Sequence, residues 1–142
     1  MKRPFPLFYL LVLILAACQQ NDPNTTVAPE WATLTHPGVS LSGTYRLAVV
    51  VIDNDKDGNK VLSFQIQDTG GKSLYQPSDL FPTRAKTYFL WDARDRVWVY
   101  SSQLGTSFWQ KEGESWVKHR YDPAVSSVPL PPPIKQDASV QH

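Results

Sequence analysis

Apolar and polar residues alternate along the middle of the chain with the two-residue period of a β-strand. Residues 61–67 show the pattern most clearly, because Leu62, Phe64 and Ile66 would share one face while serine and glutamine share the other. Residues 44–52 are rich in β-branched and aromatic residues and are apolar on both faces, which is typical of a strand covered on both sides. The pattern therefore predicts β structure.

Turn-forming residues separate the expected strands. Asp57-Gly58, Gly70-Gly71 and Glu112-Gly113 are typical of tight turns. Further short strands are expected at residues 73–76, 87–91, 96–101, 106–110 and 116–121. The one weak helical candidate is a turn at Ser78–Leu80, which Ser78 could cap. The expected fold is all-β: a small antiparallel meander of five to seven strands, forming a curled sheet or a small sandwich.

The length of the loop after Trp91 decides which aromatic rings share a face. A four-residue loop at residues 92–95 would place on one face Phe89, Trp91, Trp98 and Tyr100. A three-residue loop would mix these residues with those of the opposite face. The sequence leaves both registers open.

The hairpin around Glu112-Gly113 has a favoured register. If these two residues are the centre of the turn, Lys111 lies opposite Glu114 and Trp109 lies opposite Trp116. The first pair joins opposite charges and the second joins aromatic rings, and each pair contributes about 0.2–1 kcal/mol. We therefore expect this register.

Aromatic residues are dense in the second half of the chain, where nine of the 34 residues from Tyr88 to Tyr121 are Phe, Trp or Tyr. Rows of rings on a sheet can stack on sugars or peptides, but a small domain without disulfides also builds its core from rings. One face must be core, so at least half of the rings are structural. The candidate ligand-binding rings are Trp91, Trp98, Trp109 and Trp116.

The N-terminal segment has the pattern of an export signal. Lys2 and Arg3 precede a 13-residue apolar run at residues 5–17, broken only by Pro6. A membrane-spanning helix needs about 20 apolar residues, whereas the apolar part of a secretory signal has about 7–15. The run ends in the tetrapeptide Leu15-Ala16-Ala17-Cys18, with the only cysteine of the chain. This tetrapeptide resembles the lipobox of bacterial prolipoproteins.

The resemblance implies that residues 1–17 are a signal peptide, removed just before Cys18. The sulfur of Cys18 would carry diacylglycerol and its new amino group a further acyl chain such as palmitate, and two or three chains give stable anchoring. Gln19, in place of the aspartate that retains such proteins in the inner membrane, implies the outer membrane if the host is Gram-negative. The alternatives are an uncleaved N-terminal anchor or an ordinary signal peptide with a chance cysteine.

Composition changes once this segment is removed. The 142-residue chain has 14 basic and 13 acidic residues. Loss of Lys2 and Arg3 leaves 12 basic residues against 13, a formal charge of −1. A near-zero charge argues against nucleic acid as a partner.

Proline-bearing segments flank the predicted domain. Residues 18–38 are polar, with scattered prolines, and are expected to form a disordered tether. Residues 123–142 include three successive prolines and are expected to be a disordered, extended Pro-rich tail. The all-β domain is then expected at residues 39–122.

The sharpest polar motif is a run of acidic residues before Gly58. Asp53, Asp55 and Asp57 resemble the first half of a calcium loop, with carboxylates at positions 1, 3 and 5 and glycine at 6. The second half departs from that pattern, because Phe64 stands where such a loop has its bidentate glutamate. A hairpin turn rich in Asp, Asn and Gly needs no metal. These three aspartates are the candidate calcium ligands.

Motifs for catalysis are weak. The three histidines are His36, His119 and His142, without the spacing of a metal pair, and neither a nucleophile elbow nor a phosphate loop occurs. Asp92 and Asp95 have arginine neighbours as natural partners. We therefore expect a non-enzymatic, lipid-anchored envelope lipoprotein without a cofactor. Its expected partners are the membrane and an envelope protein or cell-wall glycan; the alternatives are a glycan-binding module that uses exposed rings and a calcium-stabilised β module.

Overall fold

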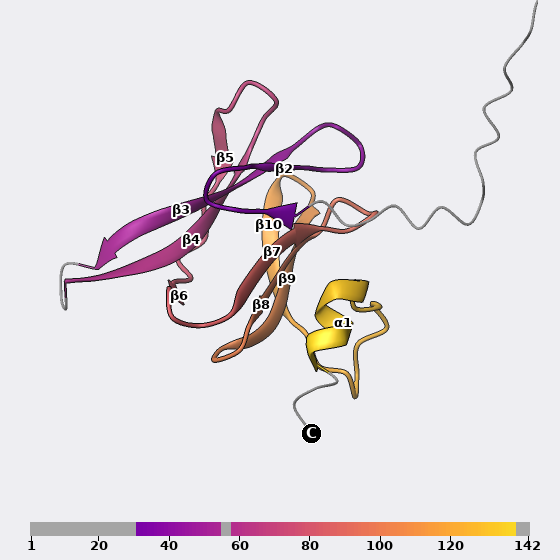
Figure 1. Cartoon of the computed structure of the whole chain (residues 1–142). Coiled ribbons are helices and arrows are strands. Elements are labelled where there is room, and N and C mark those ends of the chain that lie inside the picture. Colours follow the sequence, from indigo (N-terminus) through magenta and orange to yellow (C-terminus); the bar gives the residue numbers. More distant parts are fainter. Residues whose placement is uncertain (1–30, 55–57, 139–142) are drawn as a thin grey trace, which may run out of the picture.

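The computed structural model describes residues 31–54 and 58–138, which form two antiparallel β-sheets packed face to face (Figure 1). The first sheet has the order β1 (Trp31–Ala32), β7 (Thr87–Trp91), β8 (Val97–Ser101), β9 (Gly105–Glu112), β10 (Ser115–Arg120). The second has the order β2 (Gly38–Val39), β3 (Arg46–Asn54), β4 (Asn59–Gln67), β5 (Ser73–Tyr75), with β6 (Phe81–Pro82) also paired to β4. One short helix, α1 (Pro132–Ala138), follows.

The all-β prediction is confirmed, in the form of a small sandwich. The described residues form ten strands rather than five to seven, because β1, β2, β5 and β6 have only two or three residues each. The predicted helical turn at Ser78–Leu80 is wrong, since this segment is an irregular loop. Its Asp79 carbonyl instead accepts a hydrogen bond from the buried Ser63 hydroxyl at 3.1 Å.

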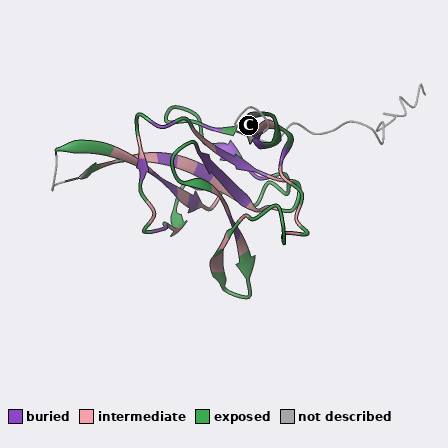
Figure 2. Cartoon of the chain, turned by 90° about the horizontal axis from the view of Figure 1, so that it is seen from below, coloured by how far each residue is buried: buried purple, intermediate pink, exposed green. Residues whose placement is uncertain are grey.

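The main core lies between the sheets and follows the predicted alternation on β4. Phe64 and Ile66 are fully buried, and the Phe64 ring packs edge-on against Trp109 at 4.9 Å between centroids. The other buried members of this cluster are Ala32, Leu47, Val49, Phe81, Phe89, Trp91, Val97 and Val99. Figure 2 shows these buried strand centres against the exposed far end of the β3–β4 hairpin. There Val51 is 45% exposed, because the hairpin extends past the facing sheet.

A second core covers the outer face of the first sheet, and it corrects the prediction of an extended tail for residues 123–138, whereas residues 139–142 lie outside the described residues. The segment after β10 folds back, so that Ile134 of α1 is fully buried among side chains of the sheet. Those side chains are Leu90, Trp98, Tyr100 and Phe108. The prolines do not prevent the helix, because Pro132 and Pro133 lie in its first turn, where a missing N–H breaks no helical hydrogen bond.

The predicted domain limits of 39 and 122 are therefore too narrow. Trp31, inside the predicted tether, begins a strand and packs edge-on against Tyr88 at 4.8 Å. At the other end the fold includes α1. Residues 18–30 of the tether lie outside the described residues.

The hairpin between β7 and β8 takes the three-residue register, so the four-residue alternative is wrong. Asp92 and Arg96 close the loop through a backbone hydrogen bond of 3.0 Å, and Trp91 lies opposite Val97. Asp95 has a φ of 55°, which makes it the left-handed residue that follows the turn in such loops. Trp91 therefore faces the other sheet, whereas Trp98 faces α1.

The expected register of the β9–β10 hairpin is also wrong, because the centre of the turn lies one residue later and each strand residue pairs two positions further on. Glu112 pairs with Ser115, so the central residues are Gly113 and Glu114. Gly113 has a φ of 62°, and a glycine at the first central position is the requirement of a type II′ turn. Trp109 consequently lies opposite Lys118, and the Lys118 ammonium is 5.4 Å from the centre of the Trp109 ring.

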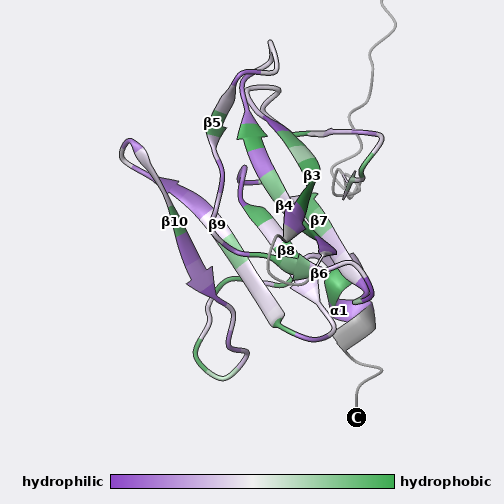
Figure 3. Cartoon of the chain, turned by 90° about the vertical axis from the view of Figure 1, so that its left-hand side faces the viewer, coloured by the Kyte–Doolittle hydropathy of each residue, from purple (hydrophilic) through white to green (hydrophobic). Residues whose placement is uncertain are grey.

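The edge strand β10 is mostly polar (Figure 3). Lys118, His119 and Arg120 follow one another along it, and Lys118 forms an ion pair with Asp79 of the facing layer. Charged residues on an edge strand discourage pairing with another chain. The charge of β10 therefore suits a free edge of the first sheet.

The fully buried tryptophans differ in whether the indole N–H has a hydrogen-bond partner, which allows the contribution of that hydrogen bond to stability to be measured. The indole N–H of Trp98 donates to Asp92 at 2.8 Å, whereas that of Trp109 has no partner in the described part of the chain. We expect Trp109→Phe to lower the free energy of unfolding by about 1–3 kcal/mol less than Trp98→Phe, because only the second variant loses a charge-assisted hydrogen bond. Urea unfolding of both variants measures the difference. Equal losses would mean that the Trp109 N–H has a partner, such as a buried water.

Candidate functional site

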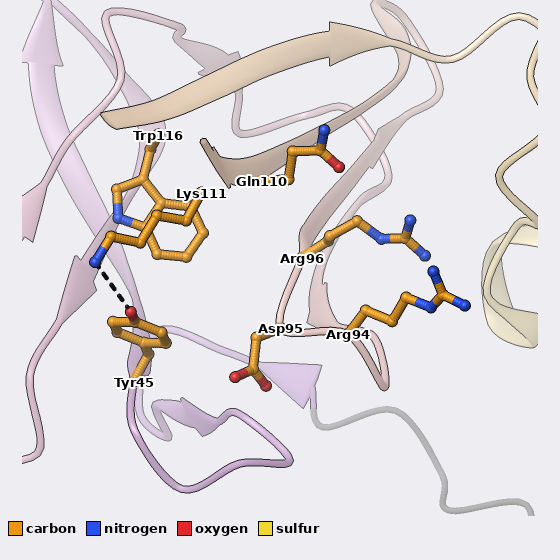
Figure 4. A pocket seen from close by; sticks show the side chains of 7 residues that line it. All are labelled: Tyr45, Arg94, Asp95, Arg96, Gln110, Lys111 and Trp116. Atoms are coloured by element: carbon orange, nitrogen blue, oxygen red, sulfur yellow. Dashed lines mark hydrogen bonds between the residues drawn. The ribbon is translucent and has the colours of Figure 1, made fainter. Parts of the chain in front are cut away.

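An open pocket of about 380 Å³ lies at one end of the sandwich (Figure 4). We call it the basic pocket. It is lined by Tyr45, Arg94, Asp95, Arg96, Gln110, Lys111 and Trp116. These residues come from the segment before β3, the β7–β8 loop and both strands of the β9–β10 hairpin.

Aromatic rings form one wall of the basic pocket. Tyr45 and Trp116 are half-buried and meet edge-on, with ring centroids 5.2 Å apart. Tyr45 also stacks on the buried Trp91 at 6.0 Å. The Lys111 ammonium is 3.4 Å from the Tyr45 hydroxyl, which accepts its hydrogen bond. Packing against the core therefore fixes the rings of this wall.

Three basic side chains and one carboxylate line the pocket, and the carboxylates of Asp92 and Glu112 contact lining residues from beside it. Arg96 is held by an ion pair with Asp92, at 2.6 Å between Nε and Oδ2. The carboxylate of Asp95 accepts a hydrogen bond from the Ser42 backbone N–H at 3.3 Å. Figure 4 shows the Arg94 and Arg96 side chains extending away from the aromatic wall. The pocket thus presents fixed rings with the Lys111 ammonium beside them, whereas the Arg96 guanidinium lies over Phe108, 5.8 Å from the centre of its ring.

A neighbouring carboxylate on β9 is held ionised. Gln110 donates a hydrogen bond to Glu112 at 2.7 Å, and His119 Nε2 lies 2.7 Å from the same oxygen. These contacts lower the pKa of Glu112, the Gln110 hydrogen bond having the larger effect. Because the folded-state pKa is depressed, the pairing favours the folded state at neutral pH and is lost as the pH falls through that pKa. His119 itself stacks on Phe108 at 5.0 Å, as part of the edge strand.

The predicted strip of ligand-binding rings is wrong for three of its four members. Trp91, Trp98 and Trp109 are at most 1% exposed and belong to the two cores. Both faces of the first sheet are covered, one by the second sheet and the other by the C-terminal segment, so no row of rings stays open. Only Trp116, which is half-buried, lines the basic pocket.

The remaining predicted site residues are not brought together in the described residues. Asp53 lies on β3 opposite Lys60, whereas Asp55 and Asp57 of the predicted calcium loop lie outside the described residues. Cys18 also lies outside them. Residues 31–54 and 58–138 contain no group of three or more His, Cys, Asp or Glu side chains that could hold a metal. The predicted pairing of Asp92 with an arginine is confirmed by Arg96.

A second, smaller pocket of about 240 Å³ lies where β4 meets β6. It includes Lys60 and Arg84, two basic residues without an aromatic wall. The two pockets lie at opposite ends of β3. Tyr45, which lines the basic pocket, directly precedes the strand, and Lys60 of the second pocket pairs with Asp53 near its other end. The seven strand residues between Tyr45 and Asp53 span about 23 Å. This second pocket provides matched control residues for the basic pocket.

Comparisons with protein-family models, with curated proteins and with solved structures find no match for this chain. Among the described residues, none of the helical segments has the length and apolar character needed to cross a membrane.

Proposed function

We propose that this protein is a lipid-anchored lipoprotein of a bacterial cell envelope and that it acts by binding, without catalysis. The N-terminal motif supports the anchor, because Ala16 and Ala17 are small enough for a signal peptidase and Cys18 directly follows them. Gln19 favours the outer membrane in a Gram-negative host. The folded domain then stands at the membrane surface and offers its surface to a ligand.

The basic pocket is the observation that carries the binding role. Arginine and lysine form strong, charge-assisted hydrogen bonds with phosphates and carboxylates. The half-buried rings of Tyr45 and Trp116 lie beside the Lys111 ammonium and can pack against an apolar or flat part of the same ligand. The pocket therefore suits a ligand with negative charge, whether on the membrane, on the cell-wall glycan or on an envelope protein.

Replacing Cys18 by serine tests the anchor. We expect wild-type protein in the membrane fraction and Cys18→Ser protein in the soluble fraction, because serine cannot carry the thioether-linked diacylglycerol. Cell fractionation followed by mass spectrometry of the N-terminal peptide measures both location and acylation. Gln19→Ser is the matched control and is expected to stay acylated. Full retention of Cys18→Ser protein in the membrane would contradict the lipoprotein proposal.

A further inference from the structure

The strand β3 has a free edge along most of its length. It pairs with β4 over the whole strand without a bulge, but with β2 only at Arg46 and Leu47. The chain before β2 turns away, since the Thr33 N–H donates to the His36 carbonyl at 2.9 Å. Within the described part of the chain, residues 48–54 therefore have no partner strand on this side, where the β3–β4 hairpin projects to the left of Figure 1.

Backbone hydrogen-bonding groups point outward along this edge. The Ser40 N–H donates to the Tyr45 carbonyl at 2.9 Å, so the backbone carbonyl of Tyr45 points toward the β2 side. Backbone groups of a strand alternate in direction from one residue to the next, and the regular pairing with β4 preserves this alternation. The N–H and C=O groups of Val49, Val51 and Asp53 consequently face the free edge.

The side chains along this edge do not protect it. Residues 48–52 are alanine, three valines and isoleucine, without charge or proline. Val51 is 45% exposed, and Val50 and Ile52 are half-buried. The other edge strands are short or charged, because β1, β2 and β5 have two or three residues each and β10 carries three successive basic residues. Short length, charge and proline are the usual protection of an edge, so β3 is the strand that suits pairing with another chain.

A second copy of the same strand fits this edge. Two antiparallel copies of residues 48–54 match end to end when Val51 lies opposite the partner's Val51. Val49 then lies opposite the partner's Asp53, and Asp53 opposite the partner's Val49. All three pairs join residues whose backbone groups face the edge, so each pair can exchange two hydrogen bonds. The free edge is therefore complementary to itself in hydrogen bonding.

The side chains also match in this register. On the outer face of the sheet, Val50 lies opposite the partner's Ile52, and such apolar cross-strand pairs stabilise a sheet. The two Asp53 carboxylates stay apart, because each lies opposite a valine. A register that brought them together would leave only residues 52–54 paired. Apolar contact and charge thus favour the same two-fold arrangement as the backbone.

We propose that this protein forms a symmetric dimer through the free edge of β3, with the second sheets of both copies joined into one continuous sheet. Val51 lies at the two-fold axis, where the hairpin extends past the facing sheet, so the first sheet does not cover the centre of the contact. An interface of this symmetry closes on itself instead of growing into a fibre. The dimer goes beyond the proposed binding function and depends on neither the lipid anchor nor the basic pocket.

The molecular mass in solution tests the dimer. The mature chain, residues 18–142 with Cys18→Ser, is measured by size-exclusion chromatography with light scattering over a wide range of concentrations. We expect a monomer–dimer equilibrium. Val51→Lys is expected to weaken dimerisation by about tenfold or more, because two like charges would meet at the axis. The matched control is Leu74→Lys, at a 48% exposed position of β5 on the opposite edge of the same sheet, and it is expected to dimerise like the parent chain.

Mixing oppositely charged variants tests the two-fold register. Val51→Glu alone is expected to be as weakly associated as Val51→Lys, whereas an equal mixture of the two is expected to form a heterodimer, because opposite charges then meet across the axis. Native mass spectrometry distinguishes the heterodimer from both homodimers. Val51→Pro is an uncharged disruption that removes the outward N–H and spares the hydrogen bonds to β4, and it is expected to be monomeric.

Thermal unfolding establishes which variants are folded, and folded variants decide the outcome. A parent chain that stays monomeric at every concentration would overturn the dimer and leave this edge to a segment of another protein. Dimerisation of folded Val51→Lys or Val51→Pro as strong as that of the parent would overturn the contact through β3. A mixture of folded Val51→Lys and Val51→Glu that stays monomeric would overturn the pairing of Val51 with the partner's Val51.

Discussion

Deleting residues 123–142 is expected to lower the free energy of unfolding by about 3 kcal/mol or more, or to prevent folding. Ile134 is fully buried, and burial of one such side chain contributes about 1.5–3 kcal/mol. The deletion also exposes Leu90, Trp98 and Phe108, which are at most 5% exposed in the intact fold. Exposed rings on this scale favour aggregation. Thermal and urea unfolding, with dye binding to detect exposed apolar surface, measure the effect.

A shorter truncation and single substitutions distinguish the loss of Ile134 packing from the effect of shortening the chain. Deletion from residue 139 onward keeps α1 and is expected to leave the melting temperature unchanged. Ile134→Ala is expected to cost about 2–5 kcal/mol, the usual range for such a truncation in a core. The exposed neighbour Lys135 is the matched control, since Lys135→Ala is expected to change the stability by about 0.5 kcal/mol or less. A normal melting temperature after deletion of residues 123–142 would restore the view of this segment as an unbound tail.

Asp92→Ala is expected to cost about 3 kcal/mol, because one carboxylate organises the β7–β8 loop. Its Oδ1 accepts from the backbone N–H groups of Arg94 at 2.8 Å and Arg96 at 3.0 Å. Its Oδ2 accepts from Arg96 Nε at 2.6 Å and from the indole N–H of Trp98 at 2.8 Å. Alanine would leave the buried Trp98 donor unpaired, which is the costly part of such a change. Urea unfolding measures the loss.

Asp92→Asn is the informative control. Asparagine keeps an acceptor for the two loop N–H groups but places an NH₂ group where Arg96 and Trp98 donate, so about half of the loss is expected. In the NMR spectrum of Asp92→Asn, the indole N–H resonance of Trp98 should shift. The indole N–H of Trp91 donates to the Gly38 carbonyl, so its resonance should stay in place. A stability of Asp92→Ala equal to that of the wild type would mean that the loop is not held by this side chain.

Strand positions were predictable because alternation is a local property. Residues 61–67 lie within β4, and their predicted inner residues Phe64 and Ile66 are fully buried. Register was less predictable, because it depends on single backbone conformations. The left-handed Asp95 fixes the loop at three residues, and Gly113 occupies the first rather than the second central position of its turn.

Exposure of the rings follows from register and from distant segments, so composition alone could not predict it. Trp98 is buried because α1 covers it, and α1 begins in a run of prolines that favours an extended chain by composition. The basic pocket combines Tyr45, Lys111 and Trp116 from parts of the chain up to 71 residues apart. No spacing within one segment indicates such a site. The opposite charges around Arg96 were the only local signal near it.

The first sheet is packed against the second sheet on one face and against the C-terminal segment on the other, and this limits the opening motions of its central strand. All five residues of β8 are buried, because this strand lies between β7 and β9 with the second sheet on one face and the C-terminal segment on the other. Its amide hydrogens can exchange with solvent only when the whole domain opens, whereas the far end of the β3–β4 hairpin can open alone. The slowest-exchanging amides therefore report the global stability of the protein, and they lie in a strand that no ligand can reach.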